Sequence, residues 1–554
     1  MQEKWRANIW PKVDPMVPPL PRRPIFEEIR EQAGIRPDKT ALNFYGYEVS
    51  FKQLDALSDQ FAGALLAQGI QKGDRVALYL ENCPQFVIGF YGIIKMGGVV
   101  IACSPMYKKD ELDYVLHDAQ PRAILLEDNF FPVLESCKYA FTPEATIVTS
   151  FSDFLPPEPA IPIHSSMSAE KQTFSGTTDW GAFLQQSAGQ LPEVAINLEE
   201  DLILLQYTAG TTGRPKGVML THENLAVHGV LVKHFYEYAE DDVHLVILPL
   251  FHVTGLDIAM NPALAKGSTL ILFARFDLMT MLDVIGDYNV THMVTIAPIN
   301  IAMLSVPNIS DFDFSGLRLV LSGGAPVPLE VHHKWQKTIG VPIVEGYGLS
   351  ESSGGIIGNN RQHYQPGTVG APVYYHDVLL WNNEENRAVG LDEAGELCIQ
   401  GPCIMKGYWQ APEETRARLT DDGWLKTGDV ARIDEAGWIR IVGRIKEMIK
   451  VSGYTVSLAE IDAYLHEHPA VAEACTIGVP HAYRGEEPKA FVVVSPEYKE
   501  KVTEEEIVAF CKNKMAAYKY PRAVQFVEGL PKSGAGKILR RVLSEKENSG
   551  ETAA

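Results

Sequence analysis

Apolar runs that end in glycine-rich turns recur along this chain and constrain its fold more than any other feature. Leu202–Tyr207 leads into TAGTTGRPKG, Leu317–Leu321 leads into SGGAP, and Pro342–Glu345 leads into GYGLSES. Helical patterns such as the one over Leu329–Ile339 lie between such runs. This alternation predicts an α/β sheet with parallel strands. Because ligands bind at the carboxyl ends of such strands, we expect these turns to form a ligand site.

The first part of the chain has the same pattern. A hairpin is predicted over Ala41–Phe44 and Tyr47–Ser50, followed by a helix over Phe51–Gln68 and a buried strand over Arg75–Leu80. The most apolar region, Phe86–Pro105, is interrupted by a lysine and a pair of glycines. It therefore predicts a helix, a turn and a strand rather than a membrane span. The stretch over 151–180 is rich in Pro and Ser and predicts a surface excursion.

The length of 554 residues exceeds what one ordinary core can support. Residues 1–24 are predicted to form an extended arm, since 11–24 are rich in proline. Short strands with glycine turns over about 367–443 predict a small β-rich subdomain. From about residue 446 the pattern becomes that of a compact α+β unit of ordinary domain size.

Charge and cysteine content narrow the class of protein. The formal net charge of −21 repels nucleic acid and gives no general attraction to anionic membranes. The seven cysteines lack metal-ligand spacing, which favours reduced thiols in a cytoplasmic protein. The first residues carry Glu3, Lys4 and Arg6 without an apolar core, so we expect no signal peptide. Peripheral membrane contact through an apolar substrate entrance stays open as an alternative.

The stretch from Tyr207 to Leu220 reads YTAGTTGRPKGVML and has the composition of a phosphate-binding loop. Glycines let successive backbone N–H groups point at an anion, while hydroxyls and a lysine add donors and charge. It is not a Walker loop, because Pro215 stands where the second glycine is required and Gly217 where the metal-binding hydroxyl is required.

Further stretches follow in order: LPLFH (Leu248–His252), SGGAP (Ser322–Pro326), GYGLSES (Gly346–Ser352), TGD (Thr427–Asp429), GRIKEMIKVSGY (Gly443–Tyr454) and LPKSGAGKILRR (Leu530–Arg541). With the phosphate loop, they resemble the signatures of the adenylate-forming superfamily of acyl-CoA synthetases, luciferases and adenylation domains. The resemblance covers roughly residues 25–545.

This resemblance implies a role for each matching residue. The phosphates of ATP would be bound by Thr208, Gly210, Thr211, Thr212, Gly213 and Lys216. The adenine and its surroundings would involve Gly323, Gly324, Ala325, Glu345, Gly346, Tyr347, Gly348 and Ser350, where Ser350 replaces the commoner threonine. Mg²⁺ would be held by Thr211 and Glu351, and the ribose by Asp429 and Arg444. Lys446 would be the hinge, Lys450 and Gly453 would serve the CoA step, Lys537 would be the catalytic lysine, and His252 would line the carboxylate and CoA side of the pocket.

The resemblance also implies an architecture and a mechanism. We expect an α/β fold in which a large N-terminal domain (1–445) has two α/β sheet subdomains and the β-rich subdomain. A mobile α+β C-terminal domain (446–554) would follow and carry Lys537. An acid and Mg·ATP would give acyl-AMP and pyrophosphate, and rotation about Lys446 would then admit CoA for thioester formation.

The chemistry of the first step supports these residue types. A carboxylate attacking the α-phosphate joins two anions, so cationic donors and a metal must be fixed there in advance. Glu351 supplies a hard oxygen ligand suited to Mg²⁺. A loop lysine such as Lys537 would by itself be read as solvated, and only the resemblance makes it catalytic.

The segments expected to line the acyl pocket are 254–262, 295–307 and 353–358, which are apolar and small apart from Asp257. They favour a medium- to long-chain fatty acid, and the sequence looks most like bacterial fatty acid–CoA ligases. His252 stands where amino-acid-activating domains keep an aspartate, which disfavours a peptide-synthetase role. An aryl acid ligase, a luciferase and a non-catalytic acyl-nucleotide binding protein stay as alternatives, and a homodimer is the expected assembly.

Overall fold

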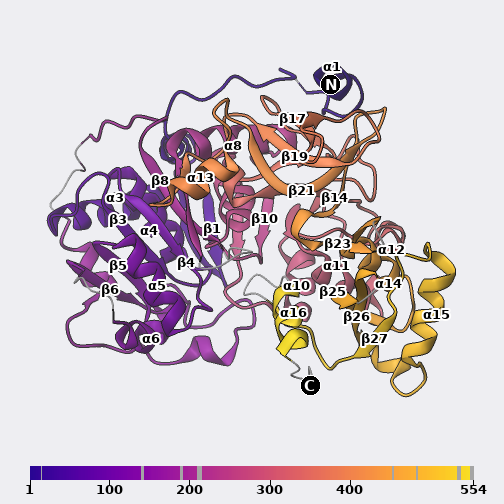
Figure 1. Cartoon of the computed structure of the whole chain (residues 1–554). Coiled ribbons are helices and arrows are strands. Elements are labelled where there is room, and N and C mark those ends of the chain that lie inside the picture. Colours follow the sequence, from indigo (N-terminus) through magenta and orange to yellow (C-terminus); the bar gives the residue numbers. More distant parts are fainter. Residues whose placement is uncertain are drawn as a thin grey trace.

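The computed structural model describes residues 1–13, 15–138, 143–187, 191, 193–208, 215–451, 454–481, 484–532 and 538–549. Two large sheets form the body of the molecule, with β3–β6 on the left of Figure 1 and β10 and β14 near its centre. The strands β17 and β19 lie above β14, α14 and α15 lie at the lower right, and α16 lies at the lower centre (Figure 1). The predicted α/β architecture is confirmed.

One large sheet has the order β16-β15-β14-β13-β12-β10-β11-β1-β2. Its central strands are parallel, with Leu245 opposite both Ile271 and Met293. The predicted hairpin is its edge, where Phe44 pairs with Tyr47. The bounds are β1 (Thr40–Phe44), β2 (Tyr47–Ser50), β10 (Val243–Val246), β11 (Thr269–Leu272), β12 (His292–Thr295), β13 (Leu319–Ser322), β14 (Ile343–Leu349), β15 (Gly354–Gly358) and β16 (Ala371–Pro372).

The other large sheet has the order β20-β9-β8-β4-β3-β5-β6-β7. Side chains of β3 alternate between two cores, since Val76 and Leu78 join the main cluster while Ala77 and Tyr79 join a second one. A strand buried on both faces is expected in a sheet covered by helices on both sides. The bounds are β3 (Arg75–Tyr79), β4 (Val99–Cys103), β5 (Ala123–Glu127), β6 (Ala145–Thr149), β7 (Thr178–Asp179), β8 (Leu202–Thr208), β9 (Lys216–Thr221) and β20 (Gly407–Tyr408).

Helices cover these sheets. α3 packs against α2 and α4, and α2 also packs against α8 and α9. α3 begins with a capping box, in which Ser50 and Gln53 bond each other's backbone amides. The bounds are α2 (Ile25–Ile35), α3 (Phe51–Ala67), α4 (Pro84–Lys95), α5 (Lys109–Ala119), α6 (Phe131–Ser136), α7 (Trp180–Leu184), α8 (His222–Phe235), α9 (Asn261–Lys266), α10 (Leu278–Asp287), α11 (Ala297–Leu304), α12 (Leu329–Ile339) and α13 (Pro412–Arg418).

The region after residue 370 contains two smaller sheets. The β-rich part has the order β18-β17-β19-β21-β22, with β17 (Asp377–Asn382), β18 (Arg387–Ala388), β19 (Gly395–Gln400), β21 (Leu425–Ile433) and β22 (Ile439–Arg444). The C-terminal sheet has the order β24-β23-β26-β25, with β27 beside β26. Its elements are β23 (Met448–Val451), β24 (Tyr454–Ser457), α14 (Leu458–His466), β25 (Val471–His481), β26 (Gly485–Val494), α15 (Glu504–Lys514), β27 (Ala523–Phe526) and α16 (Arg540–Ser549).

The structure corrects the expected turn at GYGLSES. The strand does not end at Glu345, because β14 continues to Leu349 and pairs antiparallel with β15. A Cβ atom on Gly348 would lie 1.7 Å from the carbonyl oxygen of Gly354. The glycines therefore permit close approach of two backbones, where the sequence pattern had suggested a turn.

Two segments expected to lie extended or on the surface are anchored by buried side chains. The arm expected over 1–24 begins with a helix, α1 (Gln2–Asn8), because Trp5 and Ile9 lie one turn apart and are both buried. The Trp5 indole N–H donates to the carbonyl of Gly437 at 2.9 Å. Within 151–180, Phe151, Phe154, Ile161, Met167 and Trp180 are buried, so this excursion is held to the main core at several points.

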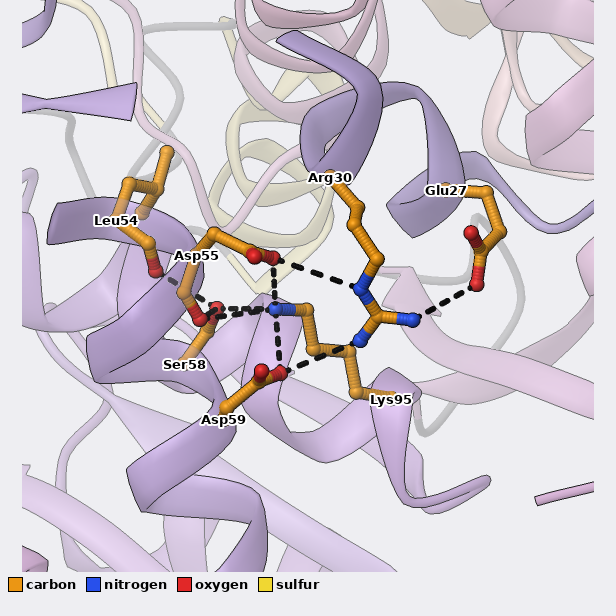
Figure 2. A network of polar contacts seen from close by, with 7 residues as sticks. All are labelled: Glu27, Arg30, Leu54, Asp55, Ser58, Asp59 and Lys95. Carbon is orange, nitrogen blue, oxygen red and sulfur yellow. Dashed lines mark hydrogen bonds and ion pairs between the residues drawn. The ribbon is translucent and has the colours of Figure 1, made fainter. Parts of the chain in front are cut away.

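A fully buried lysine joins α3 and α4 (Figure 2). Lys95 Nζ lies 2.5 Å from Asp55 Oδ1 and 2.7 Å from Asp59 Oδ1, and it donates to Ser58 Oγ at 2.9 Å. Arg30 of α2 reaches the same two carboxylates, at 3.9 Å and 3.4 Å. The network pairs the buried charge and ties three helices together. In the described part of the chain, no helix has both the length and the apolar character to cross a membrane.

Candidate active site

The turn expected to hold adenine follows β13 at the carboxyl end of the sheet. Gly324 and Ala325 are exposed there, and Gly324 adopts φ +79°. Gly323 faces the strand β14, since a Cβ on it would lie 3.5 Å from the carbonyl oxygen of Gly346. An exposed, glycine-rich turn in this position can present its backbone to a flat ligand.

Glu345 shapes this turn from beneath. Its side chain is buried, and it accepts hydrogen bonds from the amides of Val327 (2.9 Å) and Gly367 (3.1 Å). His332 Nε2 lies 2.9 Å from the same carboxylate. The backbone carbonyl of Glu345 accepts from Asn359 as well. The sequence predicted Glu345 to be a cofactor-binding residue. In the structure its carboxylate and carbonyl oxygens accept hydrogen bonds from Val327, Gly367 and Asn359 of neighbouring segments.

Asp429 is held between two residues that the sequence predicted to surround the nucleoside. The Tyr347 hydroxyl donates to Asp429 Oδ2 at 2.6 Å, and Arg444 Nε lies 3.0 Å from Oδ1. Asp429 and Arg444 are direct partners across β21 and β22. Burial and the Asp429 charge hold the pKa of Tyr347 well above its usual range, so its hydroxyl remains a donor. The structure brings together a buried carboxylate, a phenol and a guanidinium.

Glu351 is the middle residue of the short 3-10 turn η6 (Ser350–Ser352), where Ser350 is buried. The Tyr408 hydroxyl donates to Glu351 Oε1 at 2.6 Å. Lys216 Nζ lies 5.3 Å from the centroid of the Tyr408 ring and 3.9 Å from Glu414. Tyr408 therefore contacts a carboxylate through its hydroxyl and a basic side chain through its ring.

Lys446 completes a group of cations near this tyrosine. It is exposed in η7 (Ile445–Glu447), between β22 and β23. Its pKa lies below the usual range because of desolvation and because Arg418 and Lys216 place like charges nearby. Lys216, Arg418 and Lys446 therefore place like charges near one another, and an anionic ligand would reduce their mutual repulsion.

His252 follows β10 in a segment that both large sheets support. Asn82 donates to the carbonyl of Leu248 at 3.0 Å and accepts from the amide of Leu250 at 2.7 Å. Gln206 of β8 donates to the carbonyl of Phe251 at 3.0 Å. The ring of His252 accepts from the Thr254 amide through Nδ1 at 3.2 Å. The predicted pocket wall thus spans the junction of the two sheets.

The C-terminal unit places Lys450 away from these groups. Its ammonium lies 3.4 Å from Glu384, between β17 and β18. Thr208 ends β8 and Lys216 begins β9 on either side of the phosphate loop. Gly210, Thr211, Thr212, Gly213, Gly453 and Lys537 lie outside the described residues, so their predicted roles stay predictions.

Comparison with known proteins decides the family. The model of the AMP-binding enzyme family matches residues 29–409, and that of the AMP-binding enzyme C-terminal domain matches residues 460–537. The chain belongs to the AMP-binding enzyme family. The predicted resemblance to adenylate-forming enzymes is confirmed.

Relatives of this family member match nearly its whole length. A long-chain-fatty-acid–CoA ligase of Bacillus subtilis (strain 168) is 38% identical over 563 residues, covering 99% of this chain and 98% of that protein. A protein of the same name from Salmonella typhimurium is 35% identical over 540 residues, covering 94% of each. A solved structure of the anthranilate CoA ligase AuaEII with anthranoyl-AMP matches with a TM-score of 0.83 and 27% identity, over 94% of this chain and 97% of that one.

The one charged residue in the expected pocket segments turns out to have internal partners. Asp257 lies in a π-helical turn, η4 (Gly255–Met260), and is fully buried. Asn261 donates to its Oδ1 at 3.1 Å, and His228 Nδ1 lies 3.2 Å from its Oδ2. Burial raises the pKa of Asp257 and lowers that of His228 to about 4, so the neutral forms are favoured. This family member therefore places no strongly ionised group at η4.

Sequence reasoning missed Tyr408, Arg418 and Asn82. Asn82 gave no signal, because it follows a strand as many turn residues do. Tyr408 did give a signal. It belongs to the sequence GYW (407–409), which comes shortly before the helix α13 that begins with a proline. Only the pairing of β20 with β9 brings Tyr408 beside the strand that follows the predicted phosphate loop in the sequence.

Asp242, His244 and His292 form a second group of metal-ligating types, buried at the amino ends of β10 and β12. Arg318 Nη1 lies 3.0 Å from Asp242, and the Ala239 amide donates to the same carboxylate at 2.6 Å. His292 lies 3.3 Å from it. A guanidinium pairs with this carboxylate, and the group lies at the opposite end of the strands from the turn expected to hold adenine.

Proposed function

We propose that this protein is an AMP-forming ligase that activates a medium- to long-chain fatty acid and transfers the acyl group to CoA. The observation that carries the proposal is the match of 38% identity over 99% of the chain to a long-chain-fatty-acid–CoA ligase. The site geometry supports it, because Arg444 and Tyr347 hold Asp429, and Tyr347 lies on β14, beside the strand β13 that leads into the turn expected to hold adenine.

The chain's own residues suggest how adenylation is favoured. Asp429 accepts hydrogen bonds from ribose hydroxyls, with Tyr347 and Arg444 fixing its orientation. Lys216 and Arg418 stabilise the negative charge that develops on the phosphates. Glu351 and Thr211 would hold Mg²⁺, which supplies charge neutralisation when bound. Lys537, presented by the C-terminal domain, adds a cation at the α-phosphate.

The second half-reaction requires a different arrangement of the C-terminal domain. Lys446 lies in the short connection between β22 and β23, where a change of few backbone angles rotates everything that follows. Lys450 follows it and lies beside Glu384, and rotation would move this lysine toward the site. Gly453 would serve the same step. The CoA thiol then attacks the acyl carbonyl, AMP leaves, and a thioester is formed.

The acyl pocket favours an alkyl chain. The segments 254–262, 295–307 and 353–358 are apolar, and Asp257 is buried with internal partners. Each buried CH₂ group contributes about 0.8 kcal/mol, so such walls select for chain length. An aryl acid is the second candidate, favoured by the structural match to an anthranilate CoA ligase.

A single-turnover experiment tests the proposal. The protein is mixed with Mg·ATP and one acid from a set of alkyl and aryl acids, the acyl-AMP is quantified, and CoA is then added. We expect acyl-AMP to accumulate with a fatty acid and to disappear into thioester and AMP after CoA is added. An aromatic acid as the best substrate would favour the second candidate, and absence of acyl-AMP with every acid would contradict ligase activity.

We further propose a cytoplasmic location, where ATP and CoA are available, with membrane contact limited to uptake of the apolar acid. A homodimer is the proposed assembly. Sedimentation with and without lipid vesicles tests the membrane contact. Measurement of the molecular mass in solution tests the homodimer.

A further inference from the structure

Tyr408 is pinned in place from two sides. Its strand β20 pairs antiparallel with β9, so that Tyr408 lies opposite Val218. The next amide, of Trp409, donates to the carbonyl of Gly217 at 2.7 Å. The amide of Tyr408 itself donates to Thr415 Oγ1 at 2.9 Å, in α13. The side chain is 5% exposed, so its position is set by the sheet and by the following helix.

The Tyr408 hydroxyl controls the orientation of Glu351. It donates to Oε1 at 2.6 Å, and the amide of Met405 donates to the Glu351 carbonyl at 2.9 Å. Side chain and backbone of Glu351 are therefore both held by one short segment, 405–408.

The ring and hydroxyl of Tyr408 also face the cations of the site. Lys216 lies over the ring, at a distance typical of a cation–π contact. Arg418 is close enough to act on the pKa of both Tyr408 and Lys446, and its Nη1 donates to the carbonyl of Lys426 at 2.9 Å. A Cβ on Gly428 would lie 2.8 Å from that Nη1, so a glycine there makes room for the guanidinium.

We propose that Tyr408 is a positioning residue for the carboxylate of Glu351: its hydroxyl holds Glu351 in the orientation in which the carboxylate would bind Mg²⁺, while its ring supports Lys216. This inference rests on the proposed adenylation site. The hydrogen bond fixes rotation of the carboxylate without removing its charge. Partners of this kind orient metal ligands, and their loss weakens metal binding.

Tyr408→Phe separates the two contributions, because it removes the hydroxyl and keeps the ring. Calorimetry would compare ATP binding with and without Mg²⁺. We expect the Mg²⁺-dependent gain in ATP affinity to fall about 10-fold, the magnitude typical of losing such a partner. The affinity for ATP without metal should be unchanged, because Lys216 still meets an aromatic ring. The half-saturating Mg²⁺ concentration for acyl-AMP formation should rise, and thioester formation from supplied acyl-AMP and CoA should not change.

Tyr79→Phe is the matched control, because this buried tyrosine donates to the carbonyl of Tyr107 at 3.0 Å in the same sheet, remote from Glu351. It should leave the Mg²⁺-dependent gain unaltered. In the Glu351→Gln background, Tyr408→Phe should have no further effect on that gain, since the two residues act as a unit. This double variant keeps the test independent of folding differences between the single variants.

Three results would overturn the proposal: an equal or larger Mg²⁺-dependent gain in Tyr408→Phe, an equal loss of ATP affinity with and without metal, or full additivity with Glu351→Gln. Because binding is read directly, the outcome is distinct from that of the ligase assay. The wild-type protein could form no acyl-AMP while Tyr408→Phe still lost the Mg²⁺-dependent gain in ATP affinity. The proposed ligase activity would then be wrong, and the positioning role of Tyr408 would stand.

Discussion

The hydroxyl of Tyr347 lies 2.6 Å from Oδ2 of Asp429, and the two residues are 82 positions apart in the sequence. One comes from β14 of a large α/β sheet and the other from β21 of the β-rich region. The contact therefore brings two structural units together at one carboxylate. Arg444 binds the other oxygen, so Asp429 is oriented before any ligand arrives.

Asp429→Asn is expected to weaken ATP binding. The substitution keeps the shape of the side chain but removes the charge that would accept ribose hydroxyls and that pairs with Arg444. Hydrogen bonds to charged groups contribute about 1.5–3 kcal/mol, so kcat/KM for ATP should fall by about 10- to 100-fold. Steady-state kinetics at varied ATP concentration checks this.

Asp434→Asn is the control for Asp429. Asp434 accepts from the amides of Gly437 and Trp438, each at 2.9 Å, in the turn between β21 and β22. It should leave kcat/KM for ATP unchanged. An equal effect of both substitutions would mean that Asp429 acts through the stability of this hairpin rather than through the nucleotide.

Lys537→Ala and Lys446→Pro should divide the two half-reactions. Lys537→Ala is expected to lose acyl-AMP formation and still convert supplied acyl-AMP and CoA to thioester. Lys446→Pro should form acyl-AMP and slow thioester formation, because a proline in the connection between β22 and β23 restricts the backbone there and at the preceding residue. Each half-reaction is measured separately by quenched flow. Equal losses of both half-reactions in either variant would contradict the assigned division of labour.

Lys95→Met should destabilise the fold. Lys95 is fully buried, and its loss leaves Asp55 and Asp59 with only the longer contacts to Arg30, at 3.9 Å and 3.4 Å. Breaking a buried pair by removing one partner costs about 3–5 kcal/mol. Thermal unfolding should show a clearly lower midpoint. Lys109→Met is the control, because Lys109 pairs with the exposed Asp110, and such a surface ion pair contributes little to stability. Similar unfolding midpoints in both variants would show that the network in Figure 2 contributes little to the stability of the fold.

Stability should fall as pH rises from about 5 to 8, partly because of two buried acids. Burial raises the pKa of Glu127 to about 8, with the Glu81 charge adding to the effect. Burial raises the pKa of Glu81 to about 7, against the opposing effect of Arg275. The folded state therefore keeps protons that the unfolded chain releases near its ordinary carboxyl pKa, and this contribution is lost as pH passes the folded pKa values.

Glu127→Gln tests this origin of the pH dependence. The amide keeps the shape of the side chain and cannot ionise, so the fall in unfolding midpoint between pH 6 and 9 should become shallower. Glu144→Gln, at an exposed carboxylate that pairs with Arg122, should keep the steeper wild-type slope over that range. An unchanged slope in Glu127→Gln would assign the pH dependence to other groups.

Much of this architecture follows from local sequence pattern. The helix over Leu329–Ile339 and the hairpin at Phe44 and Tyr47 were predictable because their periodicity and turns are local. The strand through Gly346–Leu349 was not, since glycine signals both a turn and a close backbone approach. The pattern also could not show that Lys95 would be buried, because its partners come from a different helix.

In the candidate site too, some residues could be predicted from local sequence and others depend on tertiary packing. Asp429 and Glu351 were predictable from short motifs, whereas the commitment of Glu345 to Val327 and Gly367 depends on how distant segments pack. Tyr408 is near Glu351 only because an edge strand of two residues pairs with β9. Such contacts are set by tertiary structure, and local patterns carry little information about them.

The most direct test of the central claim is kcat/KM for AMP release, measured together with thioester formation, across acids from acetate through octanoate, palmitate and oleate to benzoate and coumarate. We predict a maximum between octanoate and oleate, with one thioester formed for each AMP released. A maximum on an aromatic acid would contradict the fatty acid assignment, and AMP release without thioester would contradict CoA as the acceptor.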